Sequence, residues 1–266
     1  MKKMKRFMYI GVVICLILSI CFPVLADNRS DAEALKDRGN ELYTRGDFDG
    51  AAALFTKAVA IDSTYAFGYN NLGITLYEKG DYKGAVVNLE RAVALDSTYA
   101  KAYNNLGNAY FAVENYEGAR ESYAKSIELQ PGFAQKLINL GNALYALGEY
   151  DAAVASYKEA EGIDKHSAEA FNNMGAALQK KGDVDGARTN YIEATKLNSN
   201  YATAFVNLGT IHFNEGRGDA DAAISYYESA IKIDSEHVLA HYNLGLAYYV
   251  KGDYPKALTE LKVLTG

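Results

Sequence analysis

The sequence repeats itself about every 34 residues, seven times, with glycine at one fixed place and alanine at another. Counted from the start of each repeat, the glycine is the eighth residue and the alanine is the twentieth, with two extra residues between them in the sixth repeat. Small residues at fixed places imply close packing, and repeats of this length are typical of stacked helix pairs. The glycines are Gly39, Gly73, Gly107, Gly141, Gly175, Gly209 and Gly245, and the alanines are Ala51, Ala85, Ala119, Ala153, Ala187, Ala223 and Ala257.

Each repeat is expected to form two helices joined by a short turn. Apolar residues at places 4, 7, 8 and 11, and again at 20, 24 and 27, have the spacing of a helical face. This spacing predicts a first helix over about places 2–14 and a second over about places 17–30, with the glycine of place 8 against the alanine of place 20. In four repeats Gly-Asp separates the helices, giving a left-handed helix end and an N-cap. The third repeat has Glu114-Asn115 instead, and we expect Asn115 to take the left-handed place.

The pattern resembles the tetratricopeptide repeat (TPR) family from about residue 32 to the end of the sequence. In the second repeat the family's characteristic places hold Tyr69, Leu72, Gly73, Leu76, Ala85, Leu89 and Ala92. The resemblance implies an all-α fold, a right-handed superhelical α-solenoid of seven helix-turn-helix TPR units. These units are expected at 32–65, 66–99, 100–133, 134–167, 168–201, 202–237, which carries the two-residue insertion, and 238–266, which is truncated and lacks the polar capping helix usual in the family.

Residues 1–26 have the features of an export signal, and a short linker, 27–31, follows them. Four basic residues precede an uncharged run from Phe7 to Ala26, and Val24-Leu25-Ala26 resembles a cleavage site. The run is about 20 residues long, so an uncleaved membrane anchor is the alternative. Either way, we expect an exported protein of the periplasm or cell envelope that contacts a membrane only through this segment.

Charge and motifs exclude several classes of function. The formal charge is −6 and becomes about −10 if residues 1–26, with Lys2, Lys3, Lys5 and Arg6, are removed; such a surface repels nucleic acid. Both cysteines, Cys15 and Cys21, lie in the apolar run, so the repeats hold no disulfide or thiolate metal site. His237 and His241 have a metal-ligand spacing without a third ligand, and His241 stands at an apolar place. We predict no catalytic residue, no metal and no cofactor, and therefore no enzyme.

A column of side-chain amides is the candidate binding site. In TPR arrays the first helices line a concave face, and here place 6 is asparagine in six repeats, places 5 and 9 add more, and place 12 is aromatic in six. Amides can pair with the main chain of an extended peptide whatever its sequence, and the ladder is similar to the groove in the TPR region of protein O-linked N-acetylglucosamine transferase. The alternative is structural, with the amides and rings packing on neighbouring helices. The predicted peptide-binding residues are Asn71, Asn105, Asn139, Asn173, Asn207, Asn243, Asn40, Asn108, Asn142, Tyr77, Phe111 and Tyr145.

Two further binding hypotheses come from the family resemblance. Lys36, Asn40, Asn71 and Lys101 occupy four of the five places of a clamp that holds acidic C-termini, although Asn105 stands where arginine is usual. Without a capping helix, Leu258, Leu261 and Leu264 are expected at a bare end of the stack, where copies could associate end to end or a partner helix could dock.

The predicted function is that of a non-enzymatic scaffold of the cell envelope, which binds an extended or helical segment of a partner protein. Two alternatives stay open. One is an accessory subunit that recruits substrate to an envelope enzyme complex, and the other is a membrane-anchored, self-assembling scaffold. The sequence does not name the partner.

Overall fold

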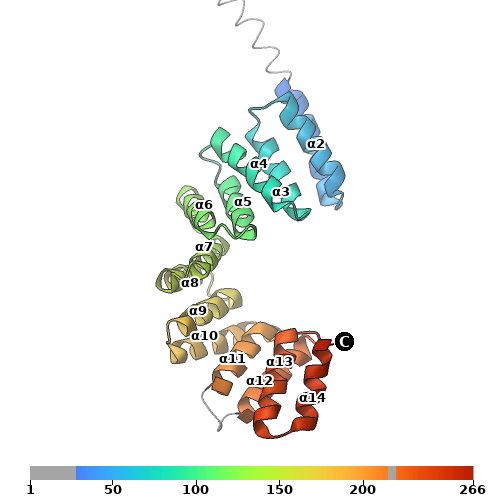
Figure 1. Ribbon diagram of the computed structural model, residues 1–266. Helices are drawn as coiled ribbons and strands as arrows, with labels where there is room; N and C mark the ends of the chain where they lie inside the picture. The colour runs from blue at the N-terminus through green and yellow to red at the C-terminus, as the bar shows by residue number, and fades with distance from the viewer. Residues whose placement is uncertain (1–27, 215–219, 266) are drawn as a thin grey trace, which may run out of the picture. The chain divides into compact units, whose positions relative to one another are not determined.

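The computed structural model describes residues 28–214 and 220–265 of the chain. Two predictions therefore lie outside the described residues. One is the export segment, expected at residues 1–26, and the other is the two-residue insertion, which falls within residues 215–219. Within the described residues all regular structure is helical, which confirms the predicted all-α fold of stacked helix pairs (Figure 1). None of the helices in these two ranges has both the length and the apolar character needed to cross a membrane.

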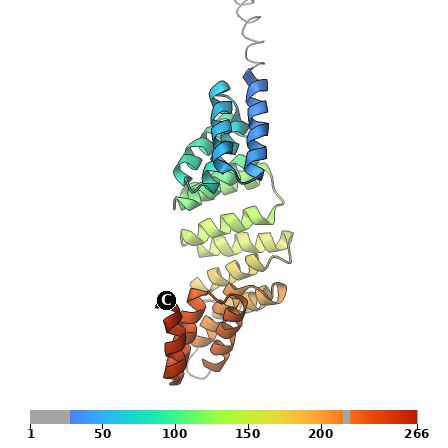
Figure 2. The same ribbon diagram turned by 90° about the vertical axis from the view of Figure 1, so that its right-hand side faces the viewer.

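The chain divides into two compact units, Met1–Gln130 and Pro131–Gly266, here called unit 1 and unit 2. Within each unit, consecutive helices pack side by side (Figure 2). Unit 1 contains a helix over 28–44, α2 (Phe48–Ile61), α3 (Ala66–Glu78), α4 (Tyr82–Leu95), α5 (Ala100–Ala112) and α6 (Tyr116–Leu129). Unit 2 contains α7 (Ala134–Ala146), α8 (Tyr150–Ile163), α9 (Ala168–Lys180), α10 (Val184–Leu197), α11 (Ala202–Asn214), α12 (Ala220–Ile233), α13 (Val238–Lys251), α14 (Tyr254–Lys262) and the 3₁₀ turn η2 (Val263–Thr265).

The turns inside the repeats follow from their Gly-Asp sequences. Gly80 has a φ of 80°, in the left-handed region that favours glycine, and the side chain of Asp81 accepts a hydrogen bond from Gly84 N at 2.9 Å. The third repeat corrects one expectation: Glu114, with a φ of 61°, takes the left-handed place, and Asn115 does not. Asn115 is the N-cap of α6 and accepts from Gly118 N at 3.0 Å. The cap requires a side-chain acceptor directly before the helix, so the preceding residue must turn.

The glycine of place 8 lies beside the backbone of place 20, as expected, but the side chain that fills the space next to it belongs to place 24. A Cβ added to Gly107 would lie 2.5 Å from Cε1 of Tyr123, and one added to Gly73 would lie 2.5 Å from Cγ of Leu89. Place 20 contributes its backbone instead, since the Ala187 carbonyl oxygen lies 3.2 Å from a Cβ added to Gly175. The glycine thus makes room for a large side chain, while the buried alanine lets the two helices approach closely.

Candidate functional site

Four asparagines of unit 1 form a continuous chain of hydrogen bonds across three repeats. Asn105 Nδ2 donates to Asn70 Oδ1 at 2.9 Å, and Asn70 Nδ2 donates to Asn71 Oδ1 at 3.1 Å. Asn71 Nδ2 then donates to Asn40 Oδ1 at 2.9 Å. Because α5, α3 and the helix over 28–44 each contribute, the chain ties three first helices together. We call it the first amide relay.

Unit 2 contains a second amide relay with the same order. Asn207 Nδ2 donates to Asn172 Oδ1 at 2.9 Å, and Asn172 Nδ2 donates to Asn173 Oδ1 at 3.1 Å. Asn173 Nδ2 donates to Asn142 Oδ1 at 3.0 Å, so the relay joins α11, α9 and α7. In both relays the asparagine of place 6 donates to the preceding repeat.

The relays show how the predicted amides are used inside the fold. Asn71, Asn105, Asn173 and Asn207 bond to a neighbouring repeat, as the structural interpretation expects. A primary amide has two N–H donors and an oxygen that accepts two bonds, so one relay bond leaves each Nδ2 a second donor. The relay therefore fixes each side chain and still leaves it able to bind a ligand.

The other two amides of place 6 have different partners. Asn243 Nδ2 donates to Thr210 Oγ1 of the preceding repeat at 3.4 Å. Asn139 Oδ1 accepts from Gln135 Nε2 of its own helix at 3.2 Å. The residues of place 5, Asn70 and Asn172, are relay members that the list of predicted site residues lacks, although their position beside Asn71 and Asn173 in the sequence is a visible signal.

Two of the three asparagines of place 9 accept hydrogen bonds from the buried tyrosines of place 24. Tyr123 OH donates to Asn108 Oδ1 at 2.8 Å, and Tyr157 OH donates to Asn142 Oδ1 at 2.7 Å. Burial raises the pKa of both tyrosines well above its usual range. A buried hydroxyl needs an acceptor, and where place 9 is Ala176 the acceptor lies elsewhere on the first helix: Tyr191 OH donates to Gln179 Oε1 at 3.0 Å.

The aromatic residues of place 12 are fixed by their own repeats. Tyr77 packs on Tyr82 with ring centroids 5.1 Å apart. The same contact joins Phe111 to Tyr116 at 5.2 Å and Tyr145 to Tyr150 at 5.4 Å, and it recurs in the first and last repeats. Each partner lies in the first turn of the following helix, so these rings are held at the end of the first helix, edge to face or tilted.

Two small hollows lie along unit 1 at equivalent places of successive repeats. The first, of about 100 Å³, is lined by Asn40, Tyr43, Phe55, Asn71, Ile74 and Thr75. The second, also of about 100 Å³, is lined by Ile74, Tyr77, Glu78, Leu89, Asn105 and Asn108. Each hollow is thus lined by side-chain amides of places 6 and 9 of the first helices and by an aromatic ring of place 12, and Ile74 lines both. Both amides of the first hollow belong to the relay, and one amide of the second does. This volume is far below that of a drug-sized ligand site, so each hollow suits one side chain.

The residues of the carboxylate-clamp hypothesis are only partly brought together. Asn40 and Asn71 are hydrogen-bonded to each other at 2.9 Å. Lys36 pairs instead with its neighbour, its Nζ lying 2.7 Å from Asp37 Oδ1, and this bond raises the pKa of Lys36. Lys101 is exposed at the start of α5. A ligand carboxylate would therefore compete with Asp37 for Lys36.

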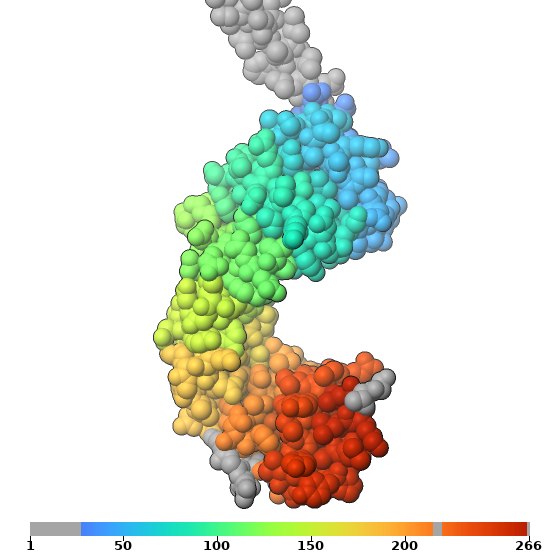
Figure 3. All heavy atoms as spheres, viewed as in Figure 1, coloured from blue at the N-terminus to red at the C-terminus, as the bar shows by residue number. Residues whose placement is uncertain are grey.

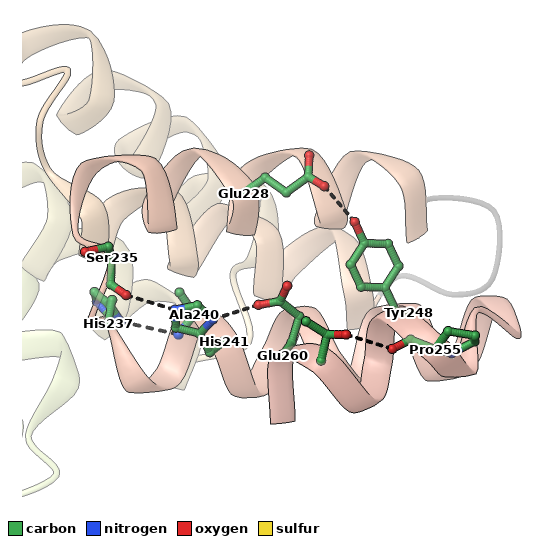
Figure 4. Close-up of polar contacts among 9 residues, drawn as sticks. Glu228, Ser235, His237, Ala240, His241, Tyr248, Pro255 and Glu260 are labelled. Carbon is green, nitrogen blue, oxygen red and sulfur yellow. Dashed lines mark hydrogen bonds and ion pairs between the residues drawn. The ribbon is translucent and has the colours of Figure 1, made fainter. Parts of the chain in front are cut away.

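The histidines of the last repeat have structural partners (Figure 4). His241 is buried, with Nδ1 2.7 Å from Glu260 Oε2 of α14 and Nε2 3.1 Å from the Ser235 carbonyl oxygen. His237 is the N-cap of α13, and its Nδ1 accepts from Ala240 N at 3.3 Å. Over residues 28–214 and 220–265, no group of three His, Cys, Asp or Glu side chains could hold a metal ion.

Comparison with family models identifies the repeats. A model described as "TPR repeat" matches residues 39–80, 75–114, 141–182 and 180–216. Two models described as "Tetratricopeptide repeat" match residues 100–133 and 216–264. No curated protein matches the sequence.

Solved structures of repeat proteins are similar to this chain. The crystal structure of MamA protein is 28% identical, with a TM-score of 0.60, and the match covers 65% of this chain and 94% of that one. The crystal structure of YrrB is described as that of a TPR protein with an unusual peptide-binding site. It is 26% identical in sequence, with a TM-score of 0.56, and the match covers 70% of this chain and 95% of that one. A tetratricopeptide repeat protein from Parabacteroides merdae is 14% identical, with a TM-score of 0.74, and the match covers 89% of this chain and 93% of that one. At this identity the likeness shows the fold alone.

Proposed function

Because the chain belongs to the tetratricopeptide repeat family, we propose that it is a non-enzymatic interaction scaffold that binds an extended segment of a partner protein along unit 1. The observation that carries this proposal is the pair of equivalent hollows, each bordered by the place-6 amide of the relay, Asn71 in the first and Asn105 in the second. A peptide that follows the relay can insert one side chain into each hollow. Its main chain can then bond to the second N–H of Asn71 and Asn105.

The relay supports this role because it holds the binding groups in place before the ligand arrives. Asn71 accepts one bond and donates another, so its side chain has little freedom left to lose on binding. The rings of Tyr77 and Phe111 are likewise held by Tyr82 and Tyr116. Such preorganisation improves affinity by reducing the entropy cost of binding. Similarity to YrrB, whose structure is described as having a peptide-binding site, favours the same kind of ligand.

The proposed location is the cell envelope, either the periplasm or the membrane surface if residues 1–26 are retained as an anchor. The proposal rests on the basic start and apolar run of this segment. Cell fractionation followed by N-terminal sequencing tests it. Recovery from the envelope fractions, with either a start at Asp27 or an intact N-terminus, is the expected result. Recovery only from the cytosol would contradict it.

Filling the hollows tests the binding site without breaking the relay. Ile74→Trp places a larger side chain between both hollows, and Ile74 contributes no polar group to the relay. The matched control is Val87→Trp, because Val87 lies on α4 and is 65% exposed. Partners captured by crosslinking from envelope extracts are identified with the wild type, and the affinity of one of them for each variant is then measured by fluorescence anisotropy.

We expect Ile74→Trp to weaken binding at least tenfold and Val87→Trp to leave it unchanged. Circular dichroism shows whether both variants keep their helices. Equal affinity of the two folded variants would exclude the hollows as the binding site. Equal loss of binding in both folded variants would show that the effect of Ile74→Trp is not specific to the hollows and would also count against the proposal.

A further inference from the structure

The last repeat exposes apolar side chains at places that the preceding repeat buries. Val206 of the sixth repeat is 1% exposed, while Tyr242 at the same place of the seventh is 45% exposed. Ile224 is 8% exposed, while Leu258, again at the same place, is 55% exposed. The difference arises because the seventh repeat covers the sixth, whereas no described residue covers the seventh in the same way.

These places form the surface on which a following repeat normally packs. In unit 2, Val206, Ile224 and Tyr227 of the sixth repeat share a buried cluster with Leu244 of the seventh. The corresponding surface of the seventh repeat consists of Tyr242, Leu246, Tyr249, Leu258 and Leu261, which we call the C-terminal face. Its helices, α13 and α14, lie at the surface of unit 2 (Figure 3).

Polar contacts hold the C-terminal face together. His241 and Glu260 join α13 to α14 at 2.7 Å, and Tyr248 OH donates to Glu228 Oε1 of α12 at 2.7 Å (Figure 4). On the face itself, the ring of Tyr249 packs edge to face on that of Tyr254 with centroids 5.5 Å apart. The exposed side chains therefore lie on a fixed surface, and clustered exposed apolar side chains can mark an interaction site.

The opposite end of the array does not match this face. At places 6, 7 and 10 the first repeat has Asp37, Arg38 and Glu41, all exposed. The second repeat buries Leu72 and Thr75 at the last two of these places. Stacking the first repeat of one copy on the last repeat of another would bury these charges against apolar side chains, which is costly. Head-to-tail association is therefore disfavoured.

The C-terminal face also offers little to the asparagine that most repeats carry at place 6. Five of these asparagines bond to an oxygen at place 5 or 9 of the preceding repeat, for example Asn70 or Thr210. At these places the seventh repeat has Tyr242, whose one polar side-chain atom is at the end of the ring, and Leu246, which has none. A partner suited to this face must be apolar in its centre.

We propose that two copies of the protein pair through their C-terminal faces as a two-fold, tail-to-tail dimer. The C-terminal face of a second copy offers an apolar surface. The first repeat, which is charged, and a following repeat that presents its asparagine of place 6 do not offer one. A two-fold interface is closed, so both exposed patches are buried and the assembly stops at two copies. Two exposed tyrosines of the face, Tyr242 and Tyr249, are of the residue type enriched in protein interfaces. This proposal concerns unit 2 and is independent of peptide binding to unit 1.

Sedimentation equilibrium of the full chain, in a mild detergent that disperses residues 7–26, tests the proposal. The wild type is expected at twice the chain mass of 29.0 kDa. Leu258→Arg is expected at the mass of one chain, because it places a charge on each apolar face at a residue that is 55% exposed. Val87→Arg, at a residue that is 65% exposed on α4, is the matched control and should remain a dimer.

Self-crosslinking tests the two-fold arrangement without depending on one variant. Tyr242→Cys, in a chain with Cys15→Ser and Cys21→Ser, should form a disulfide-linked dimer under oxidation, and Val87→Cys in the same background should not. A monomeric wild type at all concentrations would overturn the proposal. So would equal masses of Leu258→Arg and Val87→Arg, or masses that rise beyond the dimer with concentration. Circular dichroism confirms that each variant is folded.

Discussion

Replacing Gly141 with alanine should destabilise the protein because the space is already filled by Tyr157. The added Cβ would lie 2.8 Å from Cδ1 and Cζ of the tyrosine ring, and closer still to Cε1. Carbon atoms normally approach to about 3.5–4.0 Å, so the ring must withdraw by roughly 1 Å. It has little room to do so, because Tyr157 is 1% exposed and its hydroxyl is bonded to Asn142 at 2.7 Å. Overpacking of this kind costs about 1–3 kcal/mol.

Gly162→Ala is the matched control for the change in helix propensity. Gly162 lies in α8 of the same helix pair, and no atom lies within 4 Å of its Cβ position. Alanine stabilises a helix by about 0.5–1 kcal/mol relative to glycine, and both variants gain this contribution. The difference between the two variants therefore isolates the packing cost, and we expect Gly141→Ala to be about 1–3 kcal/mol less stable than Gly162→Ala.

Urea and thermal unfolding, followed by far-UV circular dichroism, measure this difference. For a chain of this size 1 kcal/mol corresponds to about 2–4 °C in Tm. Gly141→Ala should melt below Gly162→Ala, and Gly162→Ala should melt at or slightly above the wild type. If the two variants unfold at the same midpoint, the packing of place 8 against place 24 is not what selects glycine.

Three further perturbations test individual contacts. Tyr157→Phe removes the bond to Asn142 and should lower the free energy of unfolding by about 0.5–1.5 kcal/mol, measured by urea unfolding; an unchanged value would contradict the bond. Glu114→Gly should raise the free energy of unfolding by about 1 kcal/mol, because Glu114 has a φ of 61°, which glycine adopts without strain; a lower Tm would refute this. Burial and the hydrogen bond to Glu90 raise the pKa of Tyr110 to about 12. Its phenolate forms more readily in the unfolded chain, so stability should fall as the pH rises from about 10 to 12. Urea midpoints over this range should fall less in Tyr110→Phe than in the wild type, and equal slopes would refute this.

The helical architecture could be predicted because its determinants are local. The spacing of apolar residues and turns such as Gly80-Asp81 specify each helix pair within one repeat. The partner of each small residue could not be predicted in the same way. A glycine such as Gly107 indicates that a large side chain packs against its helix. Whether that side chain comes from place 20 or place 24 depends on the angle at which the two helices cross.

The amides of the candidate site illustrate the same limit. Their column was visible in the sequence, yet the acceptor of each bond lies in another repeat. Asn71 bonds to place 9 of the repeat before it, and Asn105 bonds to place 5 of the repeat before it. This choice depends on which neighbouring places carry an oxygen, so it requires the offset between repeats as well as the spacing within one. Asn70 is part of the relay because it carries the oxygen that Asn105 of the next repeat reaches.

The two amide relays also define the modular unit of the chain. Their members, Asn40, Asn70, Asn71 and Asn105 in one and Asn142, Asn172, Asn173 and Asn207 in the other, differ in number by 102 throughout, which is three repeats of 34 residues. The translational symmetry of the hydrogen bonds is thus three repeats long, as if a triplet had been duplicated. An engineered array would be extended most safely by copying a whole triplet, such as 134–237, because each relay donor of the copy would then meet an acceptor that this sequence already pairs with it.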